Sequence, residues 1–242
     1  MVISQLPHTR YRRHSWPVAA GVVACLAAAA LACSAQPVVT AAPAVRVVVV
    51  GDSLSTGHGT SPRYAWPALI RTDPRLAGFQ VVNAAENGSG YVRPGDTDGT
   101  FGSQVDHFVT RDTGVVVFFG SENDLDYDPA VVGAAAFAAI THAEAVAPAA
   151  KIIVVGPPSY STDADQGLLE IRGQLKSAAQ GAGAEFVDPI AEGWISDDVE
   201  DLIGPDGDHP TVAGQRYLLE HIAAVIEQAA QQPVAEPGRA SE

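Results

Sequence analysis

Hydrophobic residues between positions 45 and 230 form two alternating kinds of segment. Short β-branched runs are almost continuously apolar, which is typical of strands buried on both faces of a parallel sheet. These runs are 45–50, 79–83, 115–119, 151–156 and 184–187. Longer Ala-rich segments with helical spacing lie between or after them, at 65–71, 101–110, 130–146, 166–180 and 211–229. The alternation predicts βαβ units and an α/β fold with a five-stranded parallel sheet.

The residues directly after the first predicted strand are candidates for function. Ligands of open α/β sheets bind where strands end and loops begin, and the first strand runs directly into Gly51-Asp52-Ser53-Leu54-Ser55. This arrangement places the Ser53 hydroxyl at the carboxyl edge of the sheet. A serine at such a position more often caps a helix than acts as a nucleophile, so a catalytic role needs a second motif.

A second motif, Asp206-Gly207-Asp208-His209-Pro210, precedes the last helical segment. An imidazole can accept a proton from serine and return it to a leaving alcohol. A carboxylate three residues before the histidine can orient the ring by accepting its Nδ1 hydrogen. Asp208 is the alternative acid, but a residue adjacent to His209 has poorer reach. We therefore predict Ser53, His209 and Asp206 as nucleophile, base and acid.

Four separated motifs together resemble the GDSL/SGNH hydrolase family along residues 45–229. They are the blocks 51–55 (GDSLS), 83–90 (NAAENGSG), 120–124 (GSEND) and 206–210 (DGDHP). The resemblance implies a flavodoxin-like three-layer α/β/α fold and a serine-dependent carboxylic ester hydrolase. It also implies an oxyanion hole made by the backbone N–H groups of Ser53 and Gly88 and by the side-chain amide of Asn123, which would stabilise charge on the carbonyl oxygen.

Two of these motifs depart from the family pattern. Ala85 stands where the second block usually has glycine, and Gly90 is a second candidate donor, although Gly88 has the better spacing from Asn83. In the third block, Ser121 occupies the usual glycine position and Gly120 precedes it. Both departures fall in the loops that would supply the Gly88 and Asn123 donors.

Other polar residues near these motifs have simpler interpretations. Asp52 and Asp124 are expected to accept backbone N–H bonds within loops, and His58 is expected to be a solvated loop residue. The substrate pocket is expected to form from loops that contain Tyr91, Tyr127 and Tyr160, but the motifs do not specify the substrate-binding residues or the substrate.

Composition and ligand spacing narrow the classes of partner. No close pair of His or Cys residues has zinc-like spacing, and no glycine-rich phosphate motif is present, so neither a metal nor a cofactor is expected.

The chain has 28 acidic and 14 basic residues. Such a surface repels nucleic acid and suits a neutral small-molecule, glycan or lipid ester. A monomer is expected.

The N-terminal region is predicted to direct export. Arg10, Arg12 and Arg13 precede an apolar stretch at 17–32, so residues 1–35 are typical of a signal peptide. Cys33 follows a run that resembles a lipobox, which would anchor the protein to the membrane through a lipid; cleavage after Ala35 is the alternative. Residues 36–44 are predicted to be a linker, 45–230 the hydrolase domain and 231–242 a disordered tail. The expected location is secreted or attached to the cell envelope.

Two alternative functions are compatible with the same residues. The enzyme could act as an acyltransferase or deacetylase on envelope glycans, because a sugar hydroxyl can replace water as the acyl acceptor. Alternatively, a non-catalytic lipoprotein could use the cleft only to bind lipid or glycan, although the complete set of triad residues weighs against this function.

Overall fold

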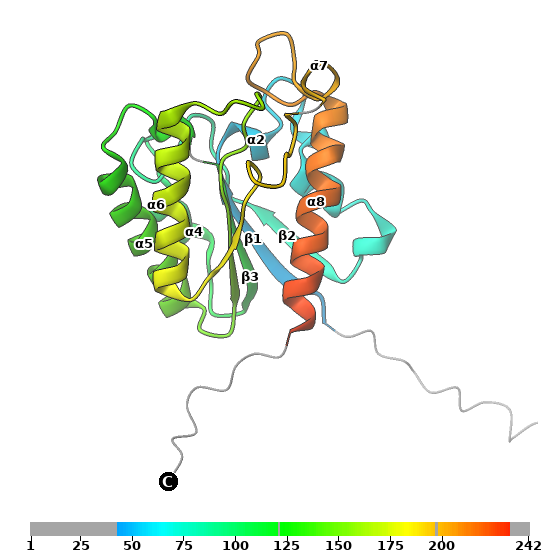
Figure 1. Ribbon diagram of the computed structural model, residues 1–242. Coiled ribbons are helices and arrows are strands. Elements are labelled where there is room, and N and C mark those ends of the chain that lie inside the picture. Colours follow the sequence, from blue (N-terminus) through cyan, green and yellow to red (C-terminus); the bar gives the residue numbers. More distant parts are fainter. Residues whose placement is uncertain (1–42, 121, 197, 233–242) are drawn as a thin grey trace, which may run out of the picture. The chain divides into compact units, whose positions relative to one another are not determined.

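The computed structural model describes residues 43–120, 122–196 and 198–232 (Figure 1). The predicted signal segment, Cys33, nearly all of the predicted linker and most of the predicted tail lie outside these residues. The described part has five strands in one parallel sheet, ordered β2-β1-β3-β4-β5. These are β1 (Val45–Gly51), β2 (Phe79–Asn83), β3 (Thr113–Phe119), β4 (Lys151–Val155) and β5 (Glu185–Val187). The predicted α/β fold with a five-stranded parallel sheet is confirmed.

The register of the three neighbouring strands β2, β1 and β3 brings their carboxyl ends to one edge of the sheet. Val49 on β1 pairs with Asn83, the last residue of β2, and Gly51 pairs with Phe119, the last residue of β3. The loops that follow these strands therefore start side by side. They carry Ser53, Gly88 and Asn123, the predicted nucleophile and oxyanion-hole residues.

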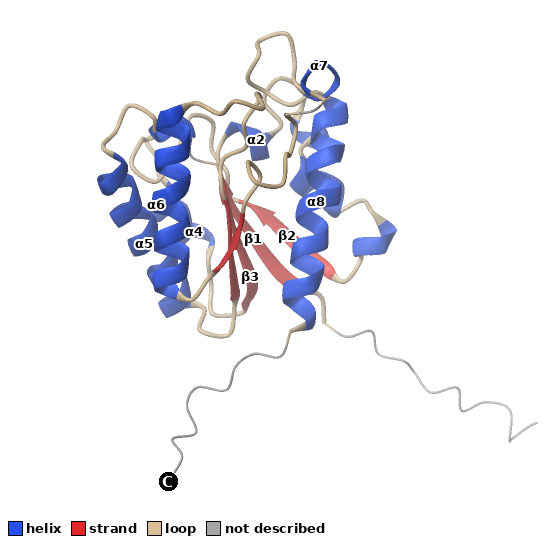
Figure 2. Cartoon of the chain, in the orientation of Figure 1, coloured by secondary structure: helices blue, strands red, loops and turns tan. Residues whose placement is uncertain are grey.

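Helices cover both faces of the sheet (Figure 2). One face packs against α4 (Phe101–Phe108), α5 (Pro129–Val146) and α6 (Gln166–Ala182), and the other against α3 (Trp66–Ile70) and α8 (Val212–Gln231). The four valines at 47–50 alternate between these two cores, and all are fully buried. Burial on both faces explains why the strands are continuous apolar runs.

The central helix α5 is long and apolar enough to cross a membrane, judged only by length and composition. Its small buried residues, which include Gly133 and Ala136, instead pack in the core between α4, α6 and the sheet. Asp128 caps this helix by accepting the backbone N–H of Ala130 at 2.9 Å. A core helix thus accounts for its apolar composition in this fold.

Several short elements were not predicted from the sequence. They are α2 (Ser53–Thr56), α7 (Val199–Leu202) and the 3₁₀ turns η1 (Pro62–Tyr64), η2 (Pro74–Leu76) and η3 (Glu122–Asp124). Helical periodicity needs two or more turns to be visible, and these elements are too short to show it. The helix predicted at 101–110 ends at Phe108, because Val109 has an extended backbone with ψ of 131°.

Candidate active site

Ser53 is the first residue of α2, directly beyond the end of β1. The Asp52 side chain caps this short helix by accepting the backbone N–H of Leu54 at 2.9 Å. Asp52 is almost completely buried, and its capping role agrees with the prediction that it accepts backbone N–H groups. The strand therefore delivers the Ser53 backbone N–H and hydroxyl to the carboxyl edge of the sheet.

Two buried glutamines that the sequence analysis missed fix the backbone around Ser53. Gln104 on α4 accepts the Gly51 N–H at 2.8 Å and donates to the Gly51 carbonyl at 3.0 Å. Gln215 on α8 donates to the Leu54 carbonyl at 3.1 Å. The signal that could have found them is an uncharged polar residue on the otherwise apolar face of a helix.

Asp206 and His209 form a closely held pair in the loop before α8. Asp206 Oδ2 lies 2.9 Å from His209 Nδ1, and Asp206 Oδ1 accepts the backbone N–H groups of Asp208 and His209, both at 3.1 Å. The backbone N–H of His209, then that of Asp208, and then the His209 ring lower the pKa of Asp206 to about 2. An ionised Asp206 holds the proton of a neutral His209 on Nδ1 and leaves Nε2 free to accept another.

The His209 ring packs against the loop that follows the Ser53 helix. The ring centroids of His58 and His209 are 4.2 Å apart, with a tilt of 47°. At Gly59 the backbone has a φ of 78°, and a Cβ atom there would lie only 2.9 Å from the His209 Cβ. A side chain at position 59 would therefore displace the histidine. His58 itself is exposed, but it contacts the proposed base, which the sequence analysis did not predict.

The structure brings His209 to Asp206 and to the loop after Ser53, but it does not join the imidazole to the serine. Within the described ranges, Ser53 Oγ makes no hydrogen bond to His209. The Nε2 atom of His209 lies 3.7 Å from Asp208 Oδ2. Catalytic hydrogen bonds are often loose without substrate and tighten when the substrate binds. The His209 side chain is 15% exposed, so a substrate can still reach it.

The loop after β2 lies beside the Ser53 helix. Asn83 Nδ2 donates to the Ser55 carbonyl at 2.7 Å, and the Thr56 hydroxyl donates to Asn87 Oδ1 at 2.5 Å. Gly88 follows with a φ of 72°, a backbone conformation that favours glycine. These contacts tie the loop that carries the Gly88 N–H to the helix that begins at Ser53.

Asn123 lies in η3, against the same loop. Its side-chain amide donates to the Ser89 carbonyl at 2.9 Å and lies 3.4 Å from Asp52 Oδ2. The neighbouring Asp124 is buried and accepts the three successive backbone N–H groups of residues 91–93, at 2.7, 3.1 and 2.8 Å. Asp124 thus has the loop-stabilising role predicted for it, and it holds Asn123 close to Gly88.

Two ionisable side chains from other loops, Glu122 and Tyr160, interact with Asp208, the residue before His209. Burial and a hydrogen bond with Asp208 raise the pKa of Glu122 to about 9, so Glu122 is a neutral carboxylic acid at pH 7. Burial also raises the pKa of Tyr160, and the neighbouring carboxyl groups of Glu122 and Asp208 add to that shift. The sequence analysis gave no role to Glu122, and it placed Tyr160 only among residues of the pocket loops.

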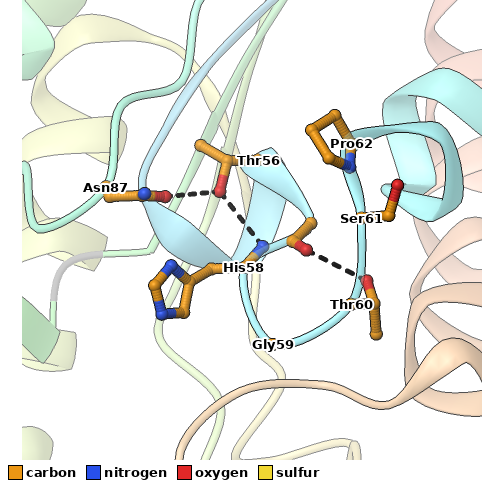
Figure 3. Close-up of a pocket in the computed structure, with 8 residues that line it drawn as sticks. Thr56, His58, Gly59, Thr60, Ser61, Pro62 and Asn87 are labelled. Carbon is orange, nitrogen blue, oxygen red and sulfur yellow. Dashed lines mark hydrogen bonds between the residues drawn. The ribbon is translucent and has the colours of Figure 1, made fainter.

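A cavity of about 300 Å³ borders the loop after Ser53 (Figure 3). Its lining comes from Asn87 and from residues 56–62. Figure 3 shows Thr56 between Asn87 and His58, and its Oγ1 atom accepts the His58 backbone N–H at 3.2 Å. The volume is at the small end of the range for ligand pockets. In the described part of the chain, no group of three or more His, Cys, Asp or Glu side chains is arranged to hold a metal ion.

Comparisons with known proteins show the family of this chain. Residues 49–217 match the model of the GDSL-like lipase/acylhydrolase family. The chain is 40% identical to "GDSL lipase Rv0518" of Mycobacterium tuberculosis over 189 residues, which cover 74% of this chain and 80% of that protein.

Among solved structures, TesA superposes with a TM-score of 0.63 at 23% identity and covers 76% of this chain and 99% of its own. Est24, a carbohydrate acetylesterase from Sinorhizobium meliloti, has a TM-score of 0.59 at 18% identity and covers 76% of this chain and 99% of its own. At such low identity these two structures establish the shared fold. With the family match and the curated relative, the conclusion is that this chain belongs to the GDSL-like lipase/acylhydrolase family and is a hydrolase of carboxylic esters.

Proposed function

We propose that Ser53, His209 and Asp206 are the nucleophile, base and acid of a serine esterase that acts on neutral esters with short acyl groups. The observation that carries the proposal is the Asp206–His209 pair at 2.9 Å, packed against the loop that follows the Ser53 helix. A carboxylate on Nδ1 selects the tautomer that a general base requires. The shared sheet edge is where side chains from β1 and from the loop before α8 can act together.

The proposed reaction proceeds in two acyl-transfer steps. Ser53 Oγ attacks the ester carbonyl carbon while His209 Nε2 takes the hydroxyl proton. The tetrahedral intermediate collapses, the bond to the alcohol oxygen breaks, and His209 gives its proton to that oxygen. Water then attacks the acyl-serine and gives a proton to His209. Collapse of the second intermediate releases the carboxylic acid and restores the Ser53 hydroxyl with the proton from His209.

The proposed oxyanion hole consists of the Ser53 N–H, the Gly88 N–H and the Asn123 amide. Its support is that Asn123 Nδ2 donates to the Ser89 carbonyl, which follows Gly88, while Thr56 and Asn87 join the Gly88 loop to the Ser53 helix. The two amide hydrogens of Asn123 are donated to the Ser89 carbonyl at 2.9 Å and to Asp52 Oδ2 at 3.4 Å, so the longer bond to Asp52 is the one that would be exchanged for a bond to the substrate oxygen. Donors held in place before the reaction cost no reorganisation when charge develops on the carbonyl oxygen.

The cavity beside His58 and Asn87 supports the proposal that the acyl group is short. A volume of about 300 Å³ holds an acetyl or butyryl group with room to spare, whereas a long acyl chain would extend into solvent. We expect kcat/KM on p-nitrophenyl esters to be highest between two and four carbons. Maximal activity on twelve or more carbons would contradict this assignment.

The experiment that tests the proposed triad is Ser53→Ala, assayed with p-nitrophenyl acetate. Loss of the nucleophile is expected to lower kcat by about 10⁴-fold or more. An unchanged thermal unfolding midpoint would show that the fold persists. Ser177→Ala, at an exposed position on α6 outside the cavity lining, is the matched control and keeps its activity within about threefold. Substantial turnover by folded Ser53→Ala protein would remove Ser53 from the mechanism.

We also propose that the enzyme acts outside the cytoplasm, because residues 1–35 have the composition of an export signal. Cys33 would carry a lipid if the lipobox is used. Fractionation of cells that express the full chain and its Cys33→Ala variant tests both points. Protein that remains in the cytoplasm would contradict export. Release of wild type and variant alike into the medium would contradict lipidation.

A further inference from the structure

The proposed mechanism defines which side of His209 the alcohol portion of the ester must occupy. His209 returns its proton through Nε2 to the alcohol oxygen, so that oxygen must come within hydrogen-bond distance of Nε2. Asp208 Oδ2 lies 3.7 Å from the same nitrogen, and the Asp208 side chain is 50% exposed. Asp208 is therefore a candidate neighbour of the remainder of the alcohol. This step rests on the proposed function.

Asp208 does not face this space alone. The Glu122 side chain, from the η3 turn that also carries Asn123, is hydrogen-bonded to Asp208. Two carboxylates cannot share such a contact when both are charged, so one of them keeps a proton. Glu122 is the one that keeps it, because burial raises its pKa whereas Asp208 is half exposed. The pair thus offers one O–H donor and several acceptor oxygens.

Tyr160 supplies a second and independent observation. Its hydroxyl oxygen is buried, and it has no hydrogen-bond partner among the residues that the structure describes. Its ring packs against the core beneath α8. Burial raises the pKa of this hydroxyl, and the carboxyl groups of Glu122 and Asp208 raise it further. A buried hydroxyl without a partner is destabilising, and near an active site it indicates a donor that a ligand would satisfy.

We propose that Tyr160, Glu122 and Asp208 form the binding subsite for the alcohol portion of the substrate, and that this portion is a polyol such as a sugar. A polyol carries several hydroxyl groups, each of which both donates and accepts. Such groups can accept from Tyr160 and donate to the carboxylate of Asp208. A plain alkyl alcohol would leave these polar atoms desolvated and unpaired. An anionic alcohol would be repelled by Asp208.

The test compares two acetate esters that differ only in the hydroxyl groups of the alcohol. One is methyl 6-O-acetyl-α-glucoside, and the other is (6-methoxytetrahydropyran-2-yl)methyl acetate, which has the same ring and methoxy group without the three ring hydroxyls. Acetate release gives kcat/KM for each. We expect the wild type to prefer the sugar ester by about tenfold or more. Tyr160→Phe should reduce that preference about 5–10-fold, as expected for the loss of one or two hydrogen bonds.

Matched controls separate this subsite from the fold and from the triad. Tyr217→Phe removes a hydroxyl from a tyrosine whose ring packs on His221 in α8, and it should keep the wild-type preference. Because Tyr160→Phe removes an unpartnered buried group, its unfolding midpoint should not fall. Methyl α-glucoside should raise the unfolding midpoint of the wild type more than that of Tyr160→Phe, which measures binding without catalysis.

The outcomes distinguish the two proposals. A wild type that labels at Ser53 with a fluorophosphonate but shows no preference for the sugar ester would overturn the polyol subsite and leave the triad intact. An unchanged preference in Tyr160→Phe would overturn the role of that hydroxyl in the same way. If the wild type does not label at Ser53 and yet hydrolyses both esters, the proposed triad is wrong.

Discussion

The two nitrogen atoms of the His209 ring have contrasting surroundings. Nδ1 is bonded to Asp206, whose other oxygen is occupied by two backbone N–H groups from the same loop. Nε2 faces Asp208, and through it Glu122 and Tyr160, which come from two other loops. The Nδ1 side is closed by contacts within its own loop, whereas the Nε2 side includes the buried Tyr160 hydroxyl, which has no hydrogen-bond partner among the described residues. The difference indicates that one side positions the base and the other receives the substrate.

The largest difference between the two sides of His209 is expected when kcat is compared for the variants Asp206→Asn and Asp208→Asn. An asparagine at 206 can donate to Nδ1, which places the ring proton on Nε2 and removes the base. We expect kcat on p-nitrophenyl acetate to fall about 10⁴-fold. Asp208→Asn keeps the shape of the side chain and should change kcat by less than about tenfold. Equal losses in both variants would contradict the assignment of the two sides.

The second effect concerns the proposed oxyanion hole. Asn123→Ala removes one donor, and we expect kcat to fall about 10²–10³-fold with little change in KM. Asn87→Ala is the matched control, because Asn87 accepts a hydrogen bond from Thr56 and supports the loop but is not one of the three proposed donors. Its loss should be at most about tenfold. Steady-state kinetics on folded variants measures both, and an unchanged rate in Asn123→Ala would remove that donor from the mechanism.

A smaller effect is expected where His58 packs on the ring of His209. His58→Ala removes the ring contact at 4.2 Å, and we expect kcat to fall about 2–10-fold, within the range of an aromatic pair. His58→Phe keeps a flat ring and should restore most of the rate. Measured kcat for the two variants tests this role. If the phenylalanine variant is as slow as the alanine variant, packing is not what His58 contributes.

The smallest effect is expected in the pH dependence of the free energy of unfolding, and it comes from Glu122 on the Nε2 side of His209. The pKa of Glu122 is about 9 in the folded chain and near 4.5 when unfolded, so the folded state holds a proton that the unfolded state releases between these values. Stability from this group is therefore complete below about pH 4.5 and is lost as the pH rises toward 9. Glu122→Gln mimics the neutral acid without titrating.

Thermal unfolding midpoints at pH 4 and pH 8 measure that effect. Glu122→Gln should unfold about 2–8 °C higher than the wild type at pH 8, and close to it at pH 4. Glu86→Gln is the matched control. Glu86 is a carboxylate on the neighbouring loop that accepts the Thr97 backbone N–H, so the Glu86→Gln variant should not gain stability at pH 8. If the unfolding midpoints of the wild type and of Glu122→Gln changed equally between pH 4 and pH 8, that result would contradict a neutral Glu122.

The sequence was sufficient for the features that depend on local pattern. Fully buried valines at 47–50 gave a continuous apolar run, which predicted the central strand and the position of Ser53 after it. The three-residue spacing of Asp206 and His209 predicted their contact. Both residues belong to one turn, so no distant part of the chain is needed to bring them together. Of the two carboxylates considered, Asp206 is the one that contacts Nδ1.

Features built from distant parts of the chain could not be predicted in the same way. Gln104 and Gln215 hold the Ser53 backbone from α4 and α8, and their helical periodicity gave no indication of their partners. Glu122 and Tyr160 approach Asp208 only because three separate loops end at one edge of the sheet. His58 was expected to be solvated because the turn that folds its ring onto His209 is not encoded by hydrophobic spacing.

The measurement that tests the central claim most directly is covalent labelling of the full chain with a fluorophosphonate, followed by mass spectrometry of its peptides. The account predicts a single adduct on Ser53, absent in Ser53→Ala and formed at least about 10²-fold more slowly in His209→Ala. An adduct on a different residue, or continued ester hydrolysis by protein in which Ser53 stays unmodified, would contradict it.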